Sequence, residues 1–200
     1  MSAASLHAST VAALERFVPP STDQGALRHT FLAFLAARED ACLRACTPGH
    51  ITASALVLDA DATHVLLTLH PRVGRWIQLG GHCEPTDDTV LDAALREALE
   101  ESGLDALTID PQVLHLDTHP ITCSGGVPTR HLDVRFLVRS APGAEIVRSA
   151  ESVDLRWWPV DALPDTAAAD TIGELVRLGR ERVAAAVAGA VAGPPLANPA

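Results

Sequence analysis

The segment from Gly80 to Leu104 constrains the fold of this chain more than any other, because a glycine pair, a short loop and an acidic helix follow one another in it. At about 100° per residue, the glutamates of the helix fall in one sector of its surface, at Glu97, Glu100 and Glu101. We expect leucines to be buried on the opposite side, at Leu91, Leu95 and Leu99. The helix is predicted from about Thr89 to Ser102, with Gly103 as its left-handed C-terminal cap.

The three carboxylates carry like charges, and each close pair costs on the order of 1 kcal/mol even in water. A solvated acidic face, with Arg96 paired to Glu100 one turn away, is one arrangement that tolerates them. A hard divalent cation is the other, because Mg²⁺ prefers oxygen ligands from carboxylates, water and phosphates. The glycine pair favours the cation, since it allows a close backbone approach and an exposed carbonyl.

Apolar periodicity divides the rest of the chain into helical ends and a middle part that mixes strands with the acidic helix. We expect helices at residues 6–18, from Ser21 toward Pro48, and from Asp165 to about residue 188. Ser21 and Gln24 have the spacing of a capping box at the start of the second helix. Strands are expected at residues 51–59, 64–70, 76–79, 113–123, 131–140 and 153–160.

The glycine pair, the loop and the helix together resemble the Nudix box, G-x5-E-x7-R-E-U-x-E-E-x-G-U, in which U is aliphatic. Residues 96–104, Arg-Glu-Ala-Leu-Glu-Glu-Ser-Gly-Leu, match its second half if Ala98 counts as aliphatic. The first half departs from the pattern, because one extra residue separates Gly81 from Arg96. Counted back from Arg96, Asp88 takes the first acidic position, which places an insertion around residues 85–87.

The resemblance covers about residues 50–163 and implies an α/β (α+β) fold, a three-layer α/β/α sandwich with a mixed sheet. Helices at the N-terminus and the C-terminus would be added to it. The chain then divides into an N-terminal helical extension (1–49), a Nudix hydrolase domain that includes the C-terminal helix (50–190), and a flexible tail (191–200).

The activity that the resemblance implies is a divalent-metal-dependent pyrophosphohydrolase, in which water attacks the pyrophosphate of a small nucleoside diphosphate-linked substrate. A nucleoside triphosphate or an ADP-ribose-like molecule would suit it. By similarity, Mg²⁺ or Mn²⁺ would be held by the carboxylates, a carbonyl of the glycine pair and a later glutamate, at Gly81, Glu97, Glu100, Glu101 and Glu151. Glu97 or Glu101 would also take a proton from the water, and Arg96 would orient a carboxylate. Glu151 is explained equally well as a surface residue.

Substrate contacts are predicted close to the box. Arg72, Arg75 and His82 would bind phosphate, although a solvated turn explains the arginines as well. The polar side chains of the strand at 131–140 and its approach either line the cleft or face solvent, at Arg130, His131, Asp133 and Arg135. Three tryptophans either stack on a base or belong to the core, at Trp76, Trp157 and Trp158. The spacing of the histidines at 70, 82, 115, 119 and 131 matches no closed zinc site.

Composition limits the partners. All 15 basic residues are arginines, against 25 acidic residues, and a net charge of −10 is unlike that of a protein that binds a nucleic acid polymer. No stretch resembles a signal peptide or a membrane span, and the four cysteines suggest no disulfide framework, so we expect a cytoplasmic protein without a membrane partner. A homodimer that uses the N-terminal helices is a hypothesis at the level of the family.

Two other functions use the same fold. An isopentenyl-diphosphate isomerase would need a cysteine in the cleft, for which Cys83 is the candidate, but the complete set of box glutamates favours hydrolysis. A non-catalytic nucleotide sensor would usually have lost those glutamates.

Overall fold

The computed structural model of the chain describes residues 3–122, 126–150, 152–167 and 169–191. The predicted tail at 192–200 and the candidate ligand Glu151 lie outside the described residues. Helices are α1 (Ala3–Arg16), α2 (Thr22–Ala37), α3 (Val90–Ser102) and α4 (Ala169–Val191). Strands are β1 (His50–Leu58), β2 (His64–Leu69), β3 (Trp76–Ile77), β4 (Leu79–His82), β5 (Leu107–Thr122), β6 (Pro128–Ser140) and β7 (Asp154–Pro159). Within these segments no helix has the length and apolar character needed to cross a bilayer.

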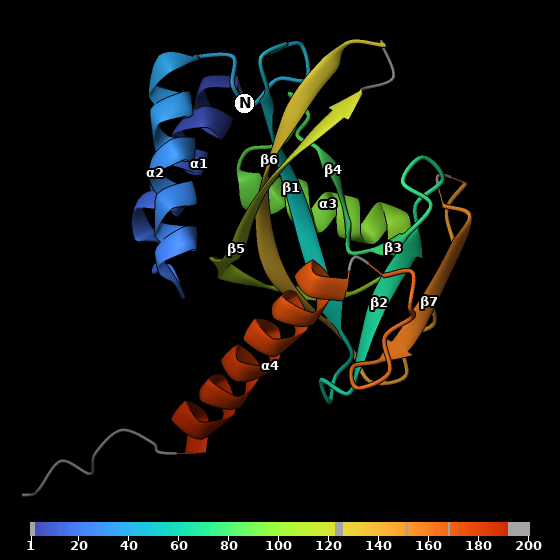
Figure 1. Ribbon diagram of the computed structural model, residues 1–200. Helices are drawn as coiled ribbons and strands as arrows, with labels where there is room; N and C mark the ends of the chain where they lie inside the picture. Colours follow the sequence, from blue (N-terminus) through green and yellow to red (C-terminus); the bar gives the residue numbers. More distant parts are fainter. Residues whose placement is uncertain (1–2, 123–125, 151, 168, 192–200) are drawn as a thin grey trace, which may run out of the picture.

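The sheet is mixed and is built around β1 (Figure 1). β1 runs parallel to β6 over its whole length and antiparallel to β4 and β2, which follow each other along its other edge. One face of the sheet shares an apolar cluster with α1, α2 and α3, and the opposite face packs against α4. This is the three-layer α/β/α sandwich expected from the sequence, with helices added at both ends of the chain.

The side chains of β1 alternate between the two faces of the sheet, and their polarity determines where the sheet has a cleft. Its apolar residues on one face, Ile51, Ala53, Ala55 and Val57, pack toward the helices α1–α3. On the other face Leu56 and Leu58 pack with α4, whereas the polar residues His50, Thr52 and Ser54 precede them on the same side of the strand. α4 therefore covers only the half of this face near the end of β1, and the polar half is left for a site.

The acidic helix α3 forms where it was predicted, but its buried side is different. Thr89 and Asp92 form a reciprocal capping box, and Gly103 ends the helix at φ 65°. The residues buried against the sheet are small, chiefly Ala93, Ala94 and Ala98, while the three leucines of the predicted stripe are only half-buried. Alanines hold the helix axis closer to the sheet than leucines would, so α3 lies close against β1 and β4.

The predicted capping box of α2 is wrong in one half. Ser21 accepts a hydrogen bond from the backbone N–H of Gln24, as expected for an N-cap. The side chain of Gln24, however, does not return to Ser21. It is buried against β5, where its Oε1 accepts from the N–H of Leu116 at 2.7 Å and its Nε2 donates to the carbonyl of Leu116 at 2.8 Å. The pairing of β5 with β6 is irregular just before this residue, between Val113 and His115.

We expect Gln24→Ala to destabilise the protein by about 2–4 kcal/mol, because the N–H and the carbonyl of Leu116 would lose their partner in a buried setting. Ser21→Ala removes only an N-cap bond and should cost about 1 kcal/mol. Urea unfolding of both variants measures the difference. Equal costs would show that Gln24 does not dock α2 on the sheet.

Candidate active site

The glycine pair belongs to β4 and not to a loop after a strand. Gly80 pairs with Ser54 of β1 and has φ 146°, a region that favours glycine. A Cβ at Gly80 would lie 2.4 Å from the Ser54 hydroxyl oxygen, and a Cβ at Gly81 would lie 2.7 Å from Oε1 of Glu97. One glycine thus fits against β1 and the other against α3. Because neither glycine has a side chain, the carboxylates of α3 can reach the backbone of β4.

Arg96 is bound to almost every part of the box. Its guanidinium donates to both carboxylate oxygens of Asp87, at 3.0 and 3.1 Å, and to the carbonyl of His82 at 2.9 Å. The same group donates to Glu97 Oε1 and to Glu100 Oε2, each at 3.1 Å. The hydrogen bonds that Arg96 donates to Asp87, with the charge of Glu97, raise the pKa of Arg96 well above its usual range. Arg96 therefore fixes the loop and orients two of the three box glutamates.

The first acidic position of the box is filled by Asp87, so the placement predicted for Asp88 is corrected. Asp87 is 5% exposed, and besides Arg96 it accepts from the backbone N–H of Glu84 at 2.7 Å. Asp88 is exposed. Counted forward from Gly81, Asp87 lies at the position that the pattern assigns to the acid. The extra residue therefore lies between Asp87 and Arg96, and not at residues 85–87.

The three box glutamates, which the sequence places in one sector of the helix, line one cleft. Glu101 is buried, and its Oε2 accepts from the N–H of Gly80 at 3.0 Å. Glu100 is the outermost, with 61% of its side chain exposed. The cleft has a volume of about 690 Å³ and is lined by all three and by Gly81. Oxygen donors gathered on one helix, with a bare glycine backbone facing them, fit a hard divalent cation.

The sheet forms the opposite wall of the cleft around Asp133. This buried carboxylate accepts from the hydroxyls of Thr52 and Ser54 at 3.0 and 2.8 Å, and from Nε of Arg135 at 2.7 Å. Arg135 also pairs with Asp117 at 3.0 Å. Asp133 and His131 thus line the cleft, Arg135 is buried behind them, and Arg130 is exposed outside it.

Histidines from adjacent strands form a row above Asp133. His82 of β4, His50 of β1 and His131 of β6 have ring centroids 5.1, 5.0 and 5.0 Å apart, and the ring of His119 on β5 is 5.3 Å from that of His131. Burial lowers the pKa of His82 to about 4 and that of His131 to about 3, with contributions from neighbouring charges, and it also lowers the pKa of His50. These imidazoles are therefore neutral at neutral pH. The spacing of the histidines along the sequence does not predict the row, because its members come from four different strands.

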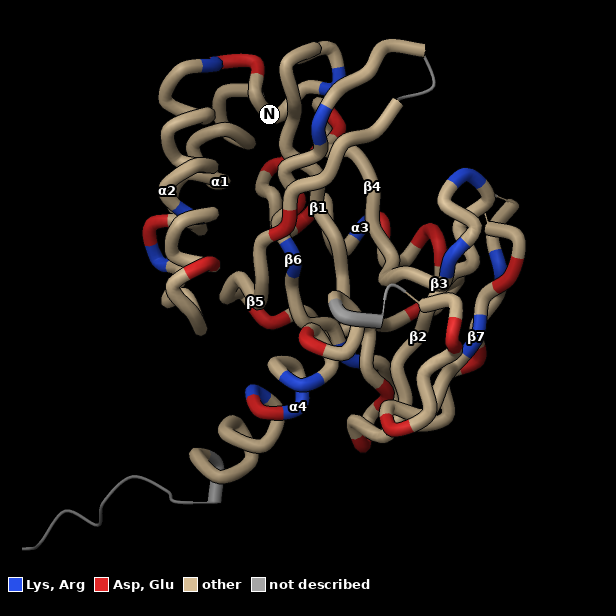
Figure 2. The backbone as a smooth tube through the Cα atoms, viewed as in Figure 1, with Lys and Arg blue, Asp and Glu red and all other residues tan. Residues whose placement is uncertain are grey.

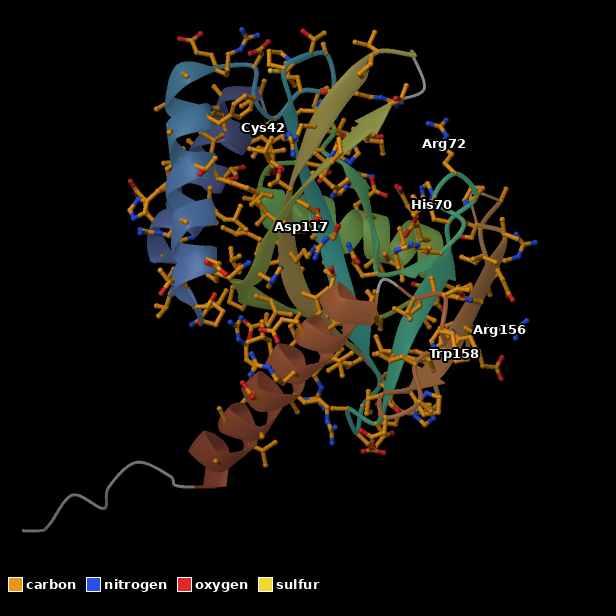
Figure 3. All side chains as sticks on the ribbon, in the orientation of Figure 1. Cys42, His70, Arg72, Asp117, Arg156 and Trp158 are labelled. Atoms are coloured by element: carbon orange, nitrogen blue, oxygen red, sulfur yellow. The ribbon has the colours of Figure 1, made fainter. Side chains whose placement is uncertain are left out.

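Two arginines reach the cleft from its rim. Arg72, in the turn between β2 and β3, lines it and projects beyond the ribbon beside His70 (Figure 3). Arg44 lines it from the segment between α2 and β1, and no sequence pattern had indicated it. Arg75 is exposed and is not among the described residues that line the cleft. Arginine positions are otherwise scattered over the elements, without a basic stripe in the part of the chain described (Figure 2).

Cys83 is not placed for chemistry. It is 5% exposed, it belongs to the apolar cluster shared with α1 and α2, and it does not line the cleft. Burial raises its pKa far above the usual range, so it is a thiol. Trp76 is likewise core, in an edge-to-face contact with Trp158 at 5.2 Å.

The two neighbouring aspartates of the loop give a matched test of the role of Arg96. Asp87→Asn should destabilise the protein by about 2 kcal/mol, because a charged partner of a largely buried guanidinium is lost. Asp88→Asn should be within about 0.5 kcal/mol of the parent protein, because Asp88 is exposed. Thermal unfolding of the two variants measures this. A larger effect at Asp88 would restore the register first predicted from the sequence.

Comparisons with known proteins agree with this geometry. The NUDIX domain family model matches residues 48–178, more than half of the chain. A Nudix-family hydrolase from Clostridium perfringens superposes with a TM-score of 0.53 at 22% identity, covering 66% of this chain and 97% of that one. A C. elegans Ap4A hydrolase gives 0.52 at 21% identity, covering 68% and 98%. A MutT protein from Methanosarcina mazei Go1 gives 0.53 at 19% identity, covering 68% and 97%.

No curated protein sequence matches the chain. At these identities the solved structures establish the fold, and the family model establishes membership. The box predicted from the sequence lies on β4 and α3, with its glutamates in the cleft. The chain therefore belongs to the Nudix family, and it is a hydrolase that acts on phosphoric anhydrides.

Proposed function

We propose that this protein is a divalent-metal-dependent pyrophosphohydrolase that cleaves a small nucleoside diphosphate-linked substrate, such as a nucleoside triphosphate or an ADP-ribose-like molecule. The observation that carries the proposal is the set of box glutamates in the cleft: Arg96 donates to Glu97 and Glu100, and Glu101 accepts from the N–H of Gly80 in β4. A cleft of about 690 Å³ is large enough for a small nucleotide. A nucleic acid polymer is disfavoured by the acidic composition.

Glu97, Glu100 and Glu101, with the carbonyl of Gly81, would hold Mg²⁺ or Mn²⁺. When bound, the metal would neutralise the pyrophosphate and lower the pKa of a coordinated water. Arg96 would act as a positioning residue, because its two bonds to Glu97 and Glu100 fix the directions of those carboxylates. Glu151 stays a predicted further ligand; its neighbour Ala150 lines the cleft.

The reaction adds water to one phosphorus and breaks the bond between that phosphorus and the bridging oxygen. Glu97 or Glu101 would take the proton of the attacking water, and the leaving phosphate would carry the bridging oxygen away. Both carboxylates lie in the inner part of the cleft, whereas Glu100 is largely exposed. Arg72 and His82, which line the cleft, would contact the phosphates; Arg75 remains a weaker candidate.

The isomerase alternative finds no support, because the thiol of Cys83 is buried outside the cleft. A nucleotide sensor is a poorer explanation than a hydrolase, since the complete glutamate set is present and oriented. A cytoplasmic location and a homodimer stay predictions.

Incubation of the protein with Mg²⁺ or Mn²⁺ and a panel of nucleoside diphosphate derivatives should release a nucleoside monophosphate. Glu100→Gln should lower kcat by at least about 100-fold, because it removes a charged metal ligand. Glu181→Gln, which changes an exposed glutamate of α4, serves as the matched control and should leave kcat unchanged. Absence of cleavage with every derivative, or full activity in Glu100→Gln, would contradict the proposal.

Removal of divalent metal should also abolish tight nucleotide binding. The box glutamates put negative charge where the pyrophosphate must lie, and only a cation reverses it. Calorimetry with a non-cleavable methylene analogue of ADP should show affinity at least about tenfold weaker after chelation. Equal affinity with and without metal would mean that the phosphates bind elsewhere, for example at Arg44 and Arg72 on the rim of the cleft.

A further inference from the structure

We propose that His50, His82 and His131 form a second cation site in the same cleft, selective for a transition-metal ion such as Zn²⁺ over Mg²⁺. One candidate ligand atom from each of the three side chains lies within 4.8 Å of the others. Their ring centroids form a nearly equilateral triangle with sides of 5.1, 5.0 and 5.0 Å. The proposal does not rest on the pyrophosphohydrolase activity, because it concerns nitrogen donors on the sheet and not the box glutamates on α3.

The strand register explains why the three imidazoles meet. His50 lies opposite His131 in the parallel pairing of β1 with β6, and His82 lies opposite Thr52 in the antiparallel pairing of β1 with β4. All three side chains therefore project from a narrow band across the sheet. Each ring is held by a different strand, so that the rigid sheet sets the triangle and no loop has to close to form it.

The distances suit a metal of the zinc class. Two nitrogens of a tetrahedral zinc site lie about 3.3 Å apart when each bond is about 2.0 Å. Ligand atoms that already lie within 4.8 Å reach that separation by small side-chain rotations. Imidazole nitrogen is a preferred donor for zinc, nickel, copper and iron, whereas Mg²⁺ prefers oxygen.

The imidazoles are also prepared for binding. Nδ1 of His50 lies 3.2 Å from the carbonyl of Cys46, and because a carbonyl only accepts, Nδ1 carries the proton and Nε2 the lone pair. A metal-bound histidine typically has such a backbone partner on its other nitrogen.

The charges around the triangle allow a cation. Arg44 and Arg72 oppose it, since both line the cleft and the charge of each contributes to the lowered pKa of His82. Asp133 lines the same wall, and Asp117 accepts from Nδ1 of the neighbouring His119 at 2.9 Å. His82 and His131 line the cleft while His50 is buried behind them. A three-nitrogen site in this position has its remaining coordination directed toward the cleft, where a phosphate oxygen or water would complete it.

Cobalt(II) is the probe for this site, because nitrogen-bound Co²⁺ of low coordination number absorbs visible light and Mg²⁺ does not. The full chain, stripped by a chelator and kept in a large excess of Mg²⁺, should bind a single equivalent of Co²⁺ with visible bands that Zn²⁺ abolishes. His82→Gln and His131→Gln should each weaken Co²⁺ binding by at least about tenfold. His29→Gln, which changes an exposed histidine of α2, is the matched control and should bind as the parent protein does.

Glu100→Gln separates this proposal from the one for the box, because it should leave the cobalt spectrum unchanged while it lowers hydrolysis. Circular dichroism confirms that each variant is folded; His82 is only half-buried and serves if His131→Gln does not fold. The proposal is overturned if no visible band forms in excess Mg²⁺, or if the band is lost in Glu100→Gln and kept in the histidine variants. A thiolate charge-transfer band that persists without either histidine would assign the ion to cysteine and would also overturn it.

Discussion

The guanidinium of Arg96 is the interaction on which the site depends. It joins the loop, through Asp87 and the carbonyl of His82, to the helix, through Glu97 and Glu100. Without it, the carboxylates of Asp87, Glu97 and Glu100 would repel one another. One internal positive charge therefore allows the loop and the helix to hold several negative charges in fixed directions.

The second constraint is how closely α3 approaches the sheet. Alanines on the helix and glycines on β4 remove the side chains that would keep the two apart. The N–H of Gly80 can then bind Glu101 directly. On the opposite wall, Asp133 has its hydrogen-bonding capacity largely used by Thr52, Ser54 and Arg135, so it serves the sheet as a fixed polar anchor. The cleft thus combines an oxygen-rich side from the helix with a nitrogen-rich side from the strands.

Local patterns predicted much of this from the sequence. The position of the box glutamates on one face of α3 and the αL cap at Gly103 depend on spacings of a few residues, and the structure confirms both. The register of the loop was wrong because two adjacent aspartates satisfy the pattern counted from opposite ends, and only burial against Arg96 distinguishes them. The prediction that the leucine stripe is buried was wrong, because the helix turns a neighbouring sector of small residues toward the sheet, chiefly Ala93, Ala94 and Ala98.

Features that depend on pairing between distant strands could not be predicted. The histidine row needs the register of β4, β1, β6 and β5, and the docking of Gln24 on β5 needs a contact between residues 92 positions apart.

Arg44 is another residue whose position in the cleft could not be predicted from the sequence, and its origin has a consequence for how the protein could diversify. The glycine pair and the box glutamates come from one continuous segment of β4 and α3, whereas Arg44 comes from the segment that links α2 to β1. Exchanging that N-terminal segment between relatives would therefore change the rim of the cleft while the box is inherited intact.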